Sequence, residues 1–318
     1  MQTIKKIQGL VAATFAAFNE DDTLNLELIP SLVDKMIHDG LTGIFICGTN
    51  GEGPNLTTEE RMQVAEAYVK AAAGRILIFV HVGHSSIKES RRLAAHAQKI
   101  GADAISSVAA FYFKPAHVKN LVDCIAAIAS AAPGLPFYYY HIPVLTNVAL
   151  DMVEFLRLGE QQIPNLAGIK YTAATLHEYQ ACLNYKNGHF DILFGFDEML
   201  LGALAIGAQG AIGSTYTFAA PLYLKVMEAF RNKNLEQARQ LQMKSIDMVR
   251  CIVKVAPIPA QRAIMHMLGF ELGNCRLPLS PLSQPEYEAL QKALNDIAFF
   301  ETVEQCRAGS SVLNGQVG

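Results

Sequence analysis

Charged residues are scarce in this chain, and neither sign is concentrated in one stretch. They make up 17% of the 318 residues, against roughly a quarter in ordinary soluble domains. The 26 basic and 29 acidic residues give a formal net charge of −3, so the basic patch that binds nucleic acid or an anionic membrane is missing. Hydrophobic residues reach 51%. This composition excludes a disordered chain and predicts a large buried core with a small-molecule partner.

Paired cysteines and long apolar runs are also missing. The six cysteines include no Cys-x-x-Cys pair, so we expect free thiols and a cytoplasmic protein. No apolar run reaches the ~18 residues of a membrane-spanning helix, since even residues 121–132 include an aspartate. Lys5 and Lys6 before the mostly apolar residues 7–18 imitate a secretory signal. Because polar residues interrupt that run, we interpret it as the first core strand.

Short apolar runs alternate with longer segments of helical periodicity, and the cycle repeats about every 25 to 30 residues. The runs are continuously apolar, which is typical of parallel strands covered on both faces. Eight such units predict an α/β fold, a closed (β/α)8 TIM barrel. An open doubly wound sheet is the alternative, because periodicity does not reveal closure. The expected strands are residues 9–15, 43–47, 76–82, 104–108, 137–141, 167–171, 192–195 and 210–213.

Beyond the last expected strand the pattern is wholly helical. We expect the barrel to occupy residues 1–218, a C-terminal helical extension packed on it to occupy 219–306, and a flexible tail to occupy 307–318. The last helix is predicted over residues 286–304. Capping boxes, in which a hydroxyl and a carboxylate satisfy each other's backbone N–H groups, are predicted at Thr57 with Glu60, Ser86 with Glu89 and Thr175 with Glu178.

The active site of a TIM barrel lies where the strands end, so the residues that follow each apolar run are informative. The second run leads into the glycine-rich loop 47–53. Its glycines allow a close approach of backbone to ligand, and its successive N–H groups can hold an anion. The loop lacks the Gly-Lys-Ser/Thr of a phosphate loop and the complete GxGxxG pattern. It is therefore either a carboxylate site or a plain tight loop.

A lysine, Lys170, stands inside the sixth apolar run. Inside a barrel it would lose its solvation, which favours the neutral amine, a nucleophile toward carbonyl groups. Alternatively, its side chain extends to the rim and pairs with a carboxylate. The sequence supports both interpretations equally.

Other polar residues also end apolar runs. Tyr140, in the fifth run, is either a core aromatic or a group that transfers protons. Asp197 and Glu198 follow the seventh run, where acids commonly complement the dipole of the next helix. His81 and His84 face opposite sides of an extended chain, which makes them poor paired metal ligands, so we expect no metal.

Together these motifs are similar to those of the dihydrodipicolinate synthase superfamily of pyruvate-dependent class I barrels. The resemblance extends from about Gly9 to Leu279, and the ordered motifs at separate strand ends carry it. The motifs are Gly48-Thr49-Asn50-Gly51-Glu52, Tyr140-His141-Ile142-Pro143, Gly168-Ile169-Lys170-Tyr171-Thr172, Gly195-Phe196-Asp197-Glu198 and Gly213-Ser214-Thr215-Tyr216.

The resemblance implies a role for each motif. Lys170 would form a Schiff base with the keto carbon, and Tyr140 would transfer the proton between a substrate hydroxyl and the leaving aldehyde. No cofactor is then required, because the protonated imine itself accepts the electrons of the cleaved bond. Thr49 and Asn50 would hold the carboxylate of the keto acid, and Thr172, Gly195, Asp197, Glu198 and Ser214 would bind the polyhydroxylated end of the substrate.

The motifs resemble most closely the superfamily members that act on sialic acids. That implies a carbon–carbon lyase that cleaves N-acetylneuraminate reversibly to pyruvate and N-acetylmannosamine. Dihydrodipicolinate synthases typically carry an arginine where this chain has Leu145, which argues for a neutral aldehyde partner. The alternatives are an aldolase for 2-keto-3-deoxy sugar acids and a ligand-binding barrel without turnover.

Tyr112 follows the fourth run and is a candidate for the phenol that the superfamily passes across a subunit interface. The resemblance therefore implies a homotetramer whose activity depends on assembly. Asn50 differs from the family pattern, since it stands where a second hydroxyl is usual.

Overall fold

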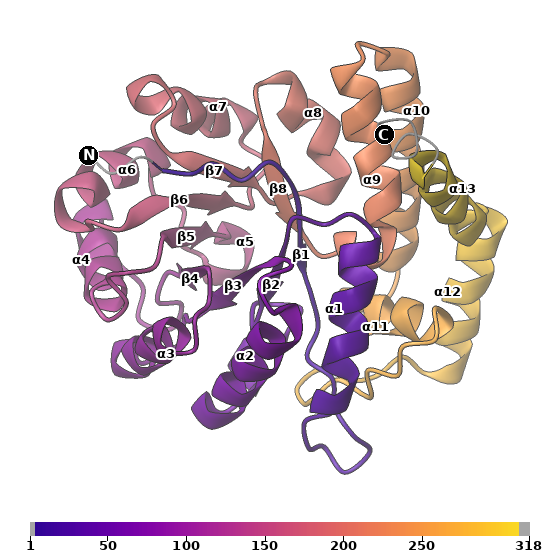
Figure 1. Ribbon diagram of the computed structural model, residues 1–318, viewed down its shortest axis with the longest axis horizontal. Coiled ribbons are helices and arrows are strands. Elements are labelled where there is room, and N and C mark those ends of the chain that lie inside the picture. The colour runs from indigo at the N-terminus through magenta and orange to yellow at the C-terminus, as the bar shows by residue number, and fades with distance from the viewer. Residues whose placement is uncertain (1–3, 312–318) are drawn as a thin grey trace.

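The computed structural model describes residues 4–311, and eight parallel strands form a closed barrel at its centre (Figure 1). Each strand pairs with the next along the chain, and β1 pairs with β8 to close the ring. The predicted TIM barrel is confirmed, and the open-sheet alternative is wrong. The strands are β1 (Gly9–Ala13), β2 (Gly43–Ile46), β3 (Leu77–His81), β4 (Ala104–Val108), β5 (Phe137–His141), β6 (Leu166–Tyr171), β7 (Asp191–Phe194) and β8 (Gly210–Gly213).

Helices follow the strands and cover the outside of the barrel (Figure 1). The predicted capping box at Thr57 and Glu60 is confirmed, with both reciprocal bonds present. The box at Ser86 is half formed, because the Glu89 carboxylate binds other side chains instead. The box at Thr175 is wrong, since its side chain caps no N–H group. The helices are α1 (Ile29–His38), α2 (Thr58–Ala72), α3 (Ile87–Lys99), α4 (Val118–Ala129), α5 (Pro143–Thr146), α6 (Met152–Gln162), α7 (Leu176–Asn184), α8 (Leu200–Ala205) and α9 (Tyr216–Arg231).

The boundary that we expected at residue 218 falls inside α9. This helix packs on β1 and β8 on one side and on α10 (Leu235–Ile252) and α13 (Phe299–Ser311) on the other. The single last helix that we predicted is divided in two at Ala298, whose φ of 50° interrupts helical geometry. The extension lies on one side of the barrel (Figure 1) and consists of α10, α11 (Pro257–Met267), α12 (Gln284–Asp296) and α13.

Arg307, which we expected to begin a flexible tail, lies within α13 instead. Its Nη2 is 3.0 Å from Oδ1 of Asp39, a buried carboxylate just after α1. A buried acid needs a counter-charge, and Asp39 has two: Arg307, and Lys35, whose Nζ lies 2.5 Å from its Oδ2. Residues 312–318 of the expected tail lie outside the described residues.

Within residues 4–311, no helix combines the length and the apolar character needed to cross a membrane. All six cysteines lie in this range, and none forms a disulfide bond with another. Five of them are buried.

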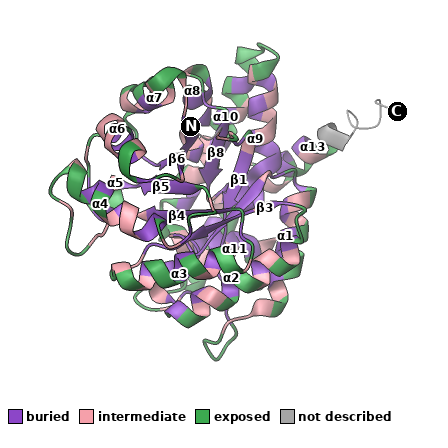
Figure 2. Cartoon of the chain, turned by 60° about the vertical axis from the view of Figure 1, so that its left-hand side comes forward, coloured by how far each residue is buried: buried purple, intermediate pink, exposed green. Residues whose placement is uncertain are grey.

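Strand side chains divide between two buried clusters, one inside the barrel and one beneath the helices. Tyr138 and Tyr140 belong to the interior cluster with Phe45, whereas Tyr139 belongs to the outer one. Figure 2 shows the strands buried almost throughout, as continuous apolar runs predict. Any polar group on the inner face is therefore isolated from water except where the strands end.

Candidate active site

A cavity of about 220 Å³ lies where the strands end, bounded by α10 and α11. Every site residue predicted from the sequence lines it, apart from Tyr112. Residues far apart in the chain thus meet at the face where TIM barrels place their chemistry. The predicted residues in its wall are Thr49, Asn50, Tyr140, Lys170, Thr172, Gly195, Asp197, Glu198 and Ser214.

An irregularity in β6 turns Lys170 toward the cavity. Two successive residues of β5 pair with Leu166 and Gly168, so β6 holds one extra residue at Ala167. Side chains alternate along a strand, and one extra residue reverses the face of all that follow. Ala167 and Lys170 consequently both face the barrel interior, although they are three positions apart.

The side-chain nitrogen of Lys170 lies against two aromatic rings. The Nζ atom lies 3.7 Å from the centroid of the Tyr140 ring and 4.4 Å from that of Phe45. Lys170 is 3% exposed and forms no ion pair within the described part of the chain. The alternative in which it pairs with a carboxylate at the rim does not fit this location. The nitrogen is positioned instead to meet a ligand in the cavity.

The loop after β2 is a compact turn that leaves backbone donors unused. The Gly53 N–H donates to the Gly48 carbonyl at 3.0 Å. A Cβ at Gly53 would lie 2.0 Å from the Cys47 carbonyl oxygen, so this glycine is required by the chain itself. The N–H groups of Thr49 and Asn50 donate to no residue that the structure describes. The Asn50 amide donates to a β1 carbonyl at 3.3 Å, which fixes the loop.

Asp197 is a buried acid with one unused oxygen. Its Oδ2 accepts hydrogen bonds from the N–H and the hydroxyl of Thr215, at 2.8 and 2.6 Å. Its Oδ1 has no partner among the described residues. Burial raises its pKa to about 6, although the Thr215 hydrogen bonds and the Lys170 charge act in the opposite direction. Oδ2 binds at the start of α9, as an acid that complements a helix dipole does, but the unused Oδ1 of this cavity-lining residue favours ligand binding as well.

Thr172 and Gly195 form a close pair at the next part of the wall. A Cβ at Gly195 would lie 2.0 Å from the Thr172 hydroxyl, so only glycine fits there. That hydroxyl is buried and has no partner among residues 4–311. Glu198 and Ser214 are partly exposed and complete this side of the cavity.

His81 holds backbone groups in place beside the cavity. Its Nδ1 lies 3.1 Å from the Cys47 carbonyl oxygen, and its Nε2 accepts an N–H of β4 at 3.3 Å. Burial, followed by the charges of Arg61 and Lys170, lowers the pKa of His81 well below 6.5. His84 lies apart and is partly exposed. Among the described residues, no group of three or more His, Cys, Asp or Glu is placed to hold a metal ion.

Tyr112 lines neither this cavity nor the one beside it. It is 78% exposed, and its ring packs edge-on against the equally exposed Phe113 at 5.1 Å. The neighbouring cavity, of about 270 Å³, is largely apolar and includes Phe111 in its wall. Thr49 and Ile142 line both cavities. An exposed aromatic pair thus stands next to an apolar hollow that adjoins the candidate site.

The sequence reasoning missed the part of the wall that lies outside the barrel repeat. Thr215, which holds Asp197, stood in a quoted motif without a role. The residues contributed by α10, α11 and the turn between them gave no signal, because periodicity does not tell where a helix beyond the last strand will pack. They are Val249, Ile252, Val253, Pro257 and Gln261.

Comparisons with known proteins place this geometry in a family. The family model described as the Dihydrodipicolinate synthetase family matches residues 6–297. The N-acetylneuraminate lyase of Rattus norvegicus is 38% identical over 303 residues, 93% of this chain and 95% of the relative. That of Xenopus tropicalis is 41% identical over 280 residues, 86% and 91% of the two chains.

Solved structures agree with this placement. The structure of the N-acetylneuraminate lyase (sialic acid aldolase) from Aliivibrio salmonicida has a TM-score of 0.91 at 38% identity, covering 93% of this chain and 98% of that one. The Proteus mirabilis N-acetylneuraminate lyase has a TM-score of 0.90 at 35% identity, covering 93% and 100%. With its family model, its relatives and its barrel in agreement, the chain belongs to the dihydrodipicolinate synthetase family.

Proposed function

We propose that this chain is a class I aldolase, an N-acetylneuraminate lyase, that reversibly cleaves N-acetylneuraminate into pyruvate and N-acetylmannosamine. One observation carries the proposal: Lys170 and Tyr140 face each other in a cavity that also holds unused backbone donors and unpartnered polar oxygens. Relatives named for this activity match more than 90% of the chain. The buried amine serves as nucleophile, so no metal or organic cofactor takes part.

Each step of the cleavage has a residue to perform it. The Lys170 amine attacks the C2 carbonyl of the open-chain sugar, and loss of water gives an imine. The C3–C4 bond then breaks, and its electrons move into the protonated imine to form an enamine. Tyr140 accepts the proton of the C4 hydroxyl as the aldehyde forms. Protonation at C3 and hydrolysis of the imine release pyruvate and restore the amine.

The walls of the cavity match the two ends of this substrate. The N–H groups of Thr49 and Asn50 would bind the carboxylate through charge-assisted hydrogen bonds. The carboxylates of Asp197 and Glu198 would accept hydrogen bonds from hydroxyl groups of the sugar. Leu145, in the wall of the neighbouring cavity, carries no charge, which suits a neutral partner.

Assembly belongs to the same proposal. We propose a cytosolic homotetramer in which Tyr112 of one subunit reaches toward Tyr140 of a neighbour. The exposure of Tyr112 and Phe113, beside an apolar cavity that adjoins the site, supports this arrangement. Light scattering should give the mass of a tetramer, and Tyr112→Phe should lower kcat without dissociating it. A monomer with full activity would contradict the proposal.

The direct test is to incubate the protein with N-acetylneuraminate and measure both products. Pyruvate and N-acetylmannosamine should appear in equal amounts, and EDTA should not reduce the rate. A parallel assay with 2-keto-3-deoxy sugar acids tests the nearest alternative. Faster turnover of those compounds, or no pyruvate from any of them, would contradict the proposal.

A further inference from the structure

Gln261, on α11, is a buried amide without a partner in the wall of the cavity. It is 5% exposed and lines the cavity together with Lys170. Neither its Oε1 nor its Nε2 forms a hydrogen bond with any residue in the described range, and the Oε1 is buried. Buried amides are nearly always bonded, because desolvation without a partner is costly. A buried side-chain amide without hydrogen-bond partners at a cavity indicates a ligand that forms those hydrogen bonds.

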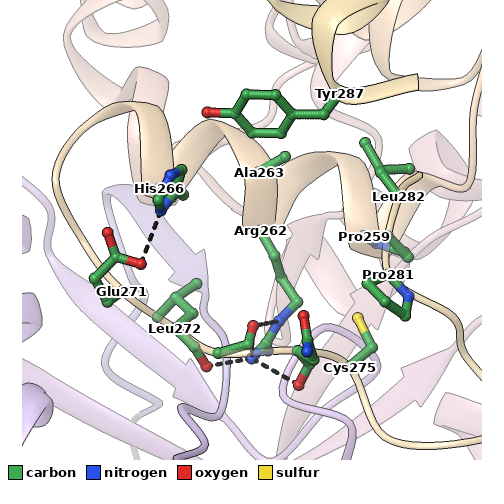
Figure 3. Close-up of a pocket in the computed structure, with 12 residues that line it drawn as sticks. Pro259, Arg262, Ala263, His266, Glu271, Leu272, Cys275, Pro281, Leu282 and Tyr287 are labelled. Atoms are coloured by element: carbon green, nitrogen blue, oxygen red, sulfur yellow. Dashed lines mark hydrogen bonds and ion pairs between the residues drawn. The ribbon is translucent and has the colours of Figure 1, made fainter. Parts of the chain in front are cut away.

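The helix that carries Gln261 is firmly held. The next residue, Arg262, donates hydrogen bonds to the carbonyls of Ala16 and Gly273, at 2.8 and 3.1 Å, and to the Glu52 carboxylate at 3.3 Å. Figure 3 shows its side chain extending from α11 toward the chain at Leu272. Burial of this network gives α11 a fixed position over the barrel. The position of Gln261 at the cavity is therefore already fixed before a ligand binds.

The surroundings of Gln261 define the group that it fits. The other cavity residues of α10, α11 and the turn between them are apolar, and Val253, in that turn, is 58% exposed. A side-chain amide both donates and accepts, as another amide does, whereas Asp197 and Glu198 when ionised only accept. An acetamido group has this combination of one amide and one methyl group.

We propose that Gln261 binds the N-acyl amide of the substrate while Val253 and its apolar neighbours contact the acyl methyl group. The inference rests on the proposed lyase function and adds the basis of its selectivity for N-acylated substrates. A site that hydrogen-bonds one substrate group discriminates strongly against analogues that lack it.

The test compares two substrates on one variant. Gln261→Met keeps the size of the side chain and removes both hydrogen-bonding groups. Its kcat/KM should fall about 10-fold or more for N-acetylneuraminate relative to the analogue with a hydroxyl in place of the acetamido group. Gln240→Met, on the exposed face of α10, is the matched control and should change neither value.

The melting temperature of the variant distinguishes a ligand-binding role of Gln261 from a structural one. Because the amide has no partner in the free protein, Gln261→Met should melt at the same temperature as the wild type or higher. If that variant does not fold, Gln261→Glu provides the second test, since it retains acceptors and loses the donor. An unchanged substrate ratio in an active enzyme would overturn this inference alone. Failure of the wild type to cleave either substrate would overturn the proposed function with it.

Discussion

Lys170 and Tyr140 are register partners on neighbouring strands, and the Lys170 Nζ lies 3.7 Å from the centroid of the Tyr140 ring. The negative face of the ring attracts this nitrogen whenever it carries a proton. The same contact brings a phenol against the nitrogen that would carry the imine. Nucleophile and proton-transfer group are thus held as one unit by the pairing of β5 with β6.

Tyr140→Phe should separate packing from chemistry. The substitution keeps the ring beside Lys170 and removes only the hydroxyl, so kcat should fall roughly 10²-fold or more while the imine still forms. Steady-state kinetics and imine trapping on one preparation check this. Tyr139→Phe, on the outer face of the same strand, should leave kcat unchanged. A kcat equal to that of the wild type in Tyr140→Phe would show that Tyr140 only packs in the site and transfers no proton.

Asp197 should give the reaction a pH dependence. Its pKa is raised to about 6 by burial, so the ionised acceptor is present above that pH and is lost as the pH falls through it. We expect kcat/KM for N-acetylneuraminate to fall between pH 7 and pH 5. Asp197→Asn should flatten this profile and lower kcat/KM by roughly 10- to 150-fold at neutral pH, the loss of one charge-assisted hydrogen bond.

The same pKa has a consequence for stability. Between about pH 4 and pH 6 the folded protein keeps a proton that the unfolded chain has lost. The contribution of Asp197 to stability therefore declines as the pH rises through this window. Asp197→Asn removes that contribution, so the variant should gain stability relative to the wild type as the pH rises. Melting curves at pH 4, 5 and 7 check the sign, and a steeper decline in the variant would contradict it.

Gly213→Ala tests the position of Asp197 without altering its charge. A Cβ at Gly213 would lie 1.6 Å from Oδ1 of that acid, so the carboxylate must move. KM for N-acetylneuraminate should rise several-fold, while pyruvate imine formation at Lys170 should be retained. Gly202→Ala, in α8, meets only a side chain at 3.6 Å and serves as control. Unchanged KM in the first variant would remove Asp197 from the site.

Arg262→Met should destabilise the fold. It leaves the buried Glu52 carboxylate without its ion pair and several backbone carbonyls without a donor. Removing one partner of a buried pair costs about 3 to 5 kcal/mol. Arg239→Met, which breaks an exposed pair with Glu236, should cost less than about 1 kcal/mol. Chemical denaturation of both variants measures the difference, and equal losses would contradict the account.

The strands could be predicted because each is a continuous apolar run between turns. The face of Lys170 could not, since it depends on an extra residue in β6 that pattern reasoning does not reveal. The role of Gln261 could not be predicted for another reason. Its place in the cavity is set by Arg262, whose hydrogen bonds join segments more than 200 residues apart. Arg307 was expected in a flexible tail because composition does not show that it forms an ion pair with Asp39, on a distant segment of the chain.

The most direct test of the central claim is to reduce the protein with borohydride in the presence of pyruvate and locate the label by mass spectrometry. One 1-carboxyethyl group per chain, the product of reducing the pyruvate imine, should be found on the peptide that contains Lys170. Lys170→Arg should take up none and should be inactive, because a guanidinium stays charged and cannot attack a carbonyl. A label on another lysine, or turnover by Lys170→Arg, would contradict the assignment of Lys170 as the nucleophile.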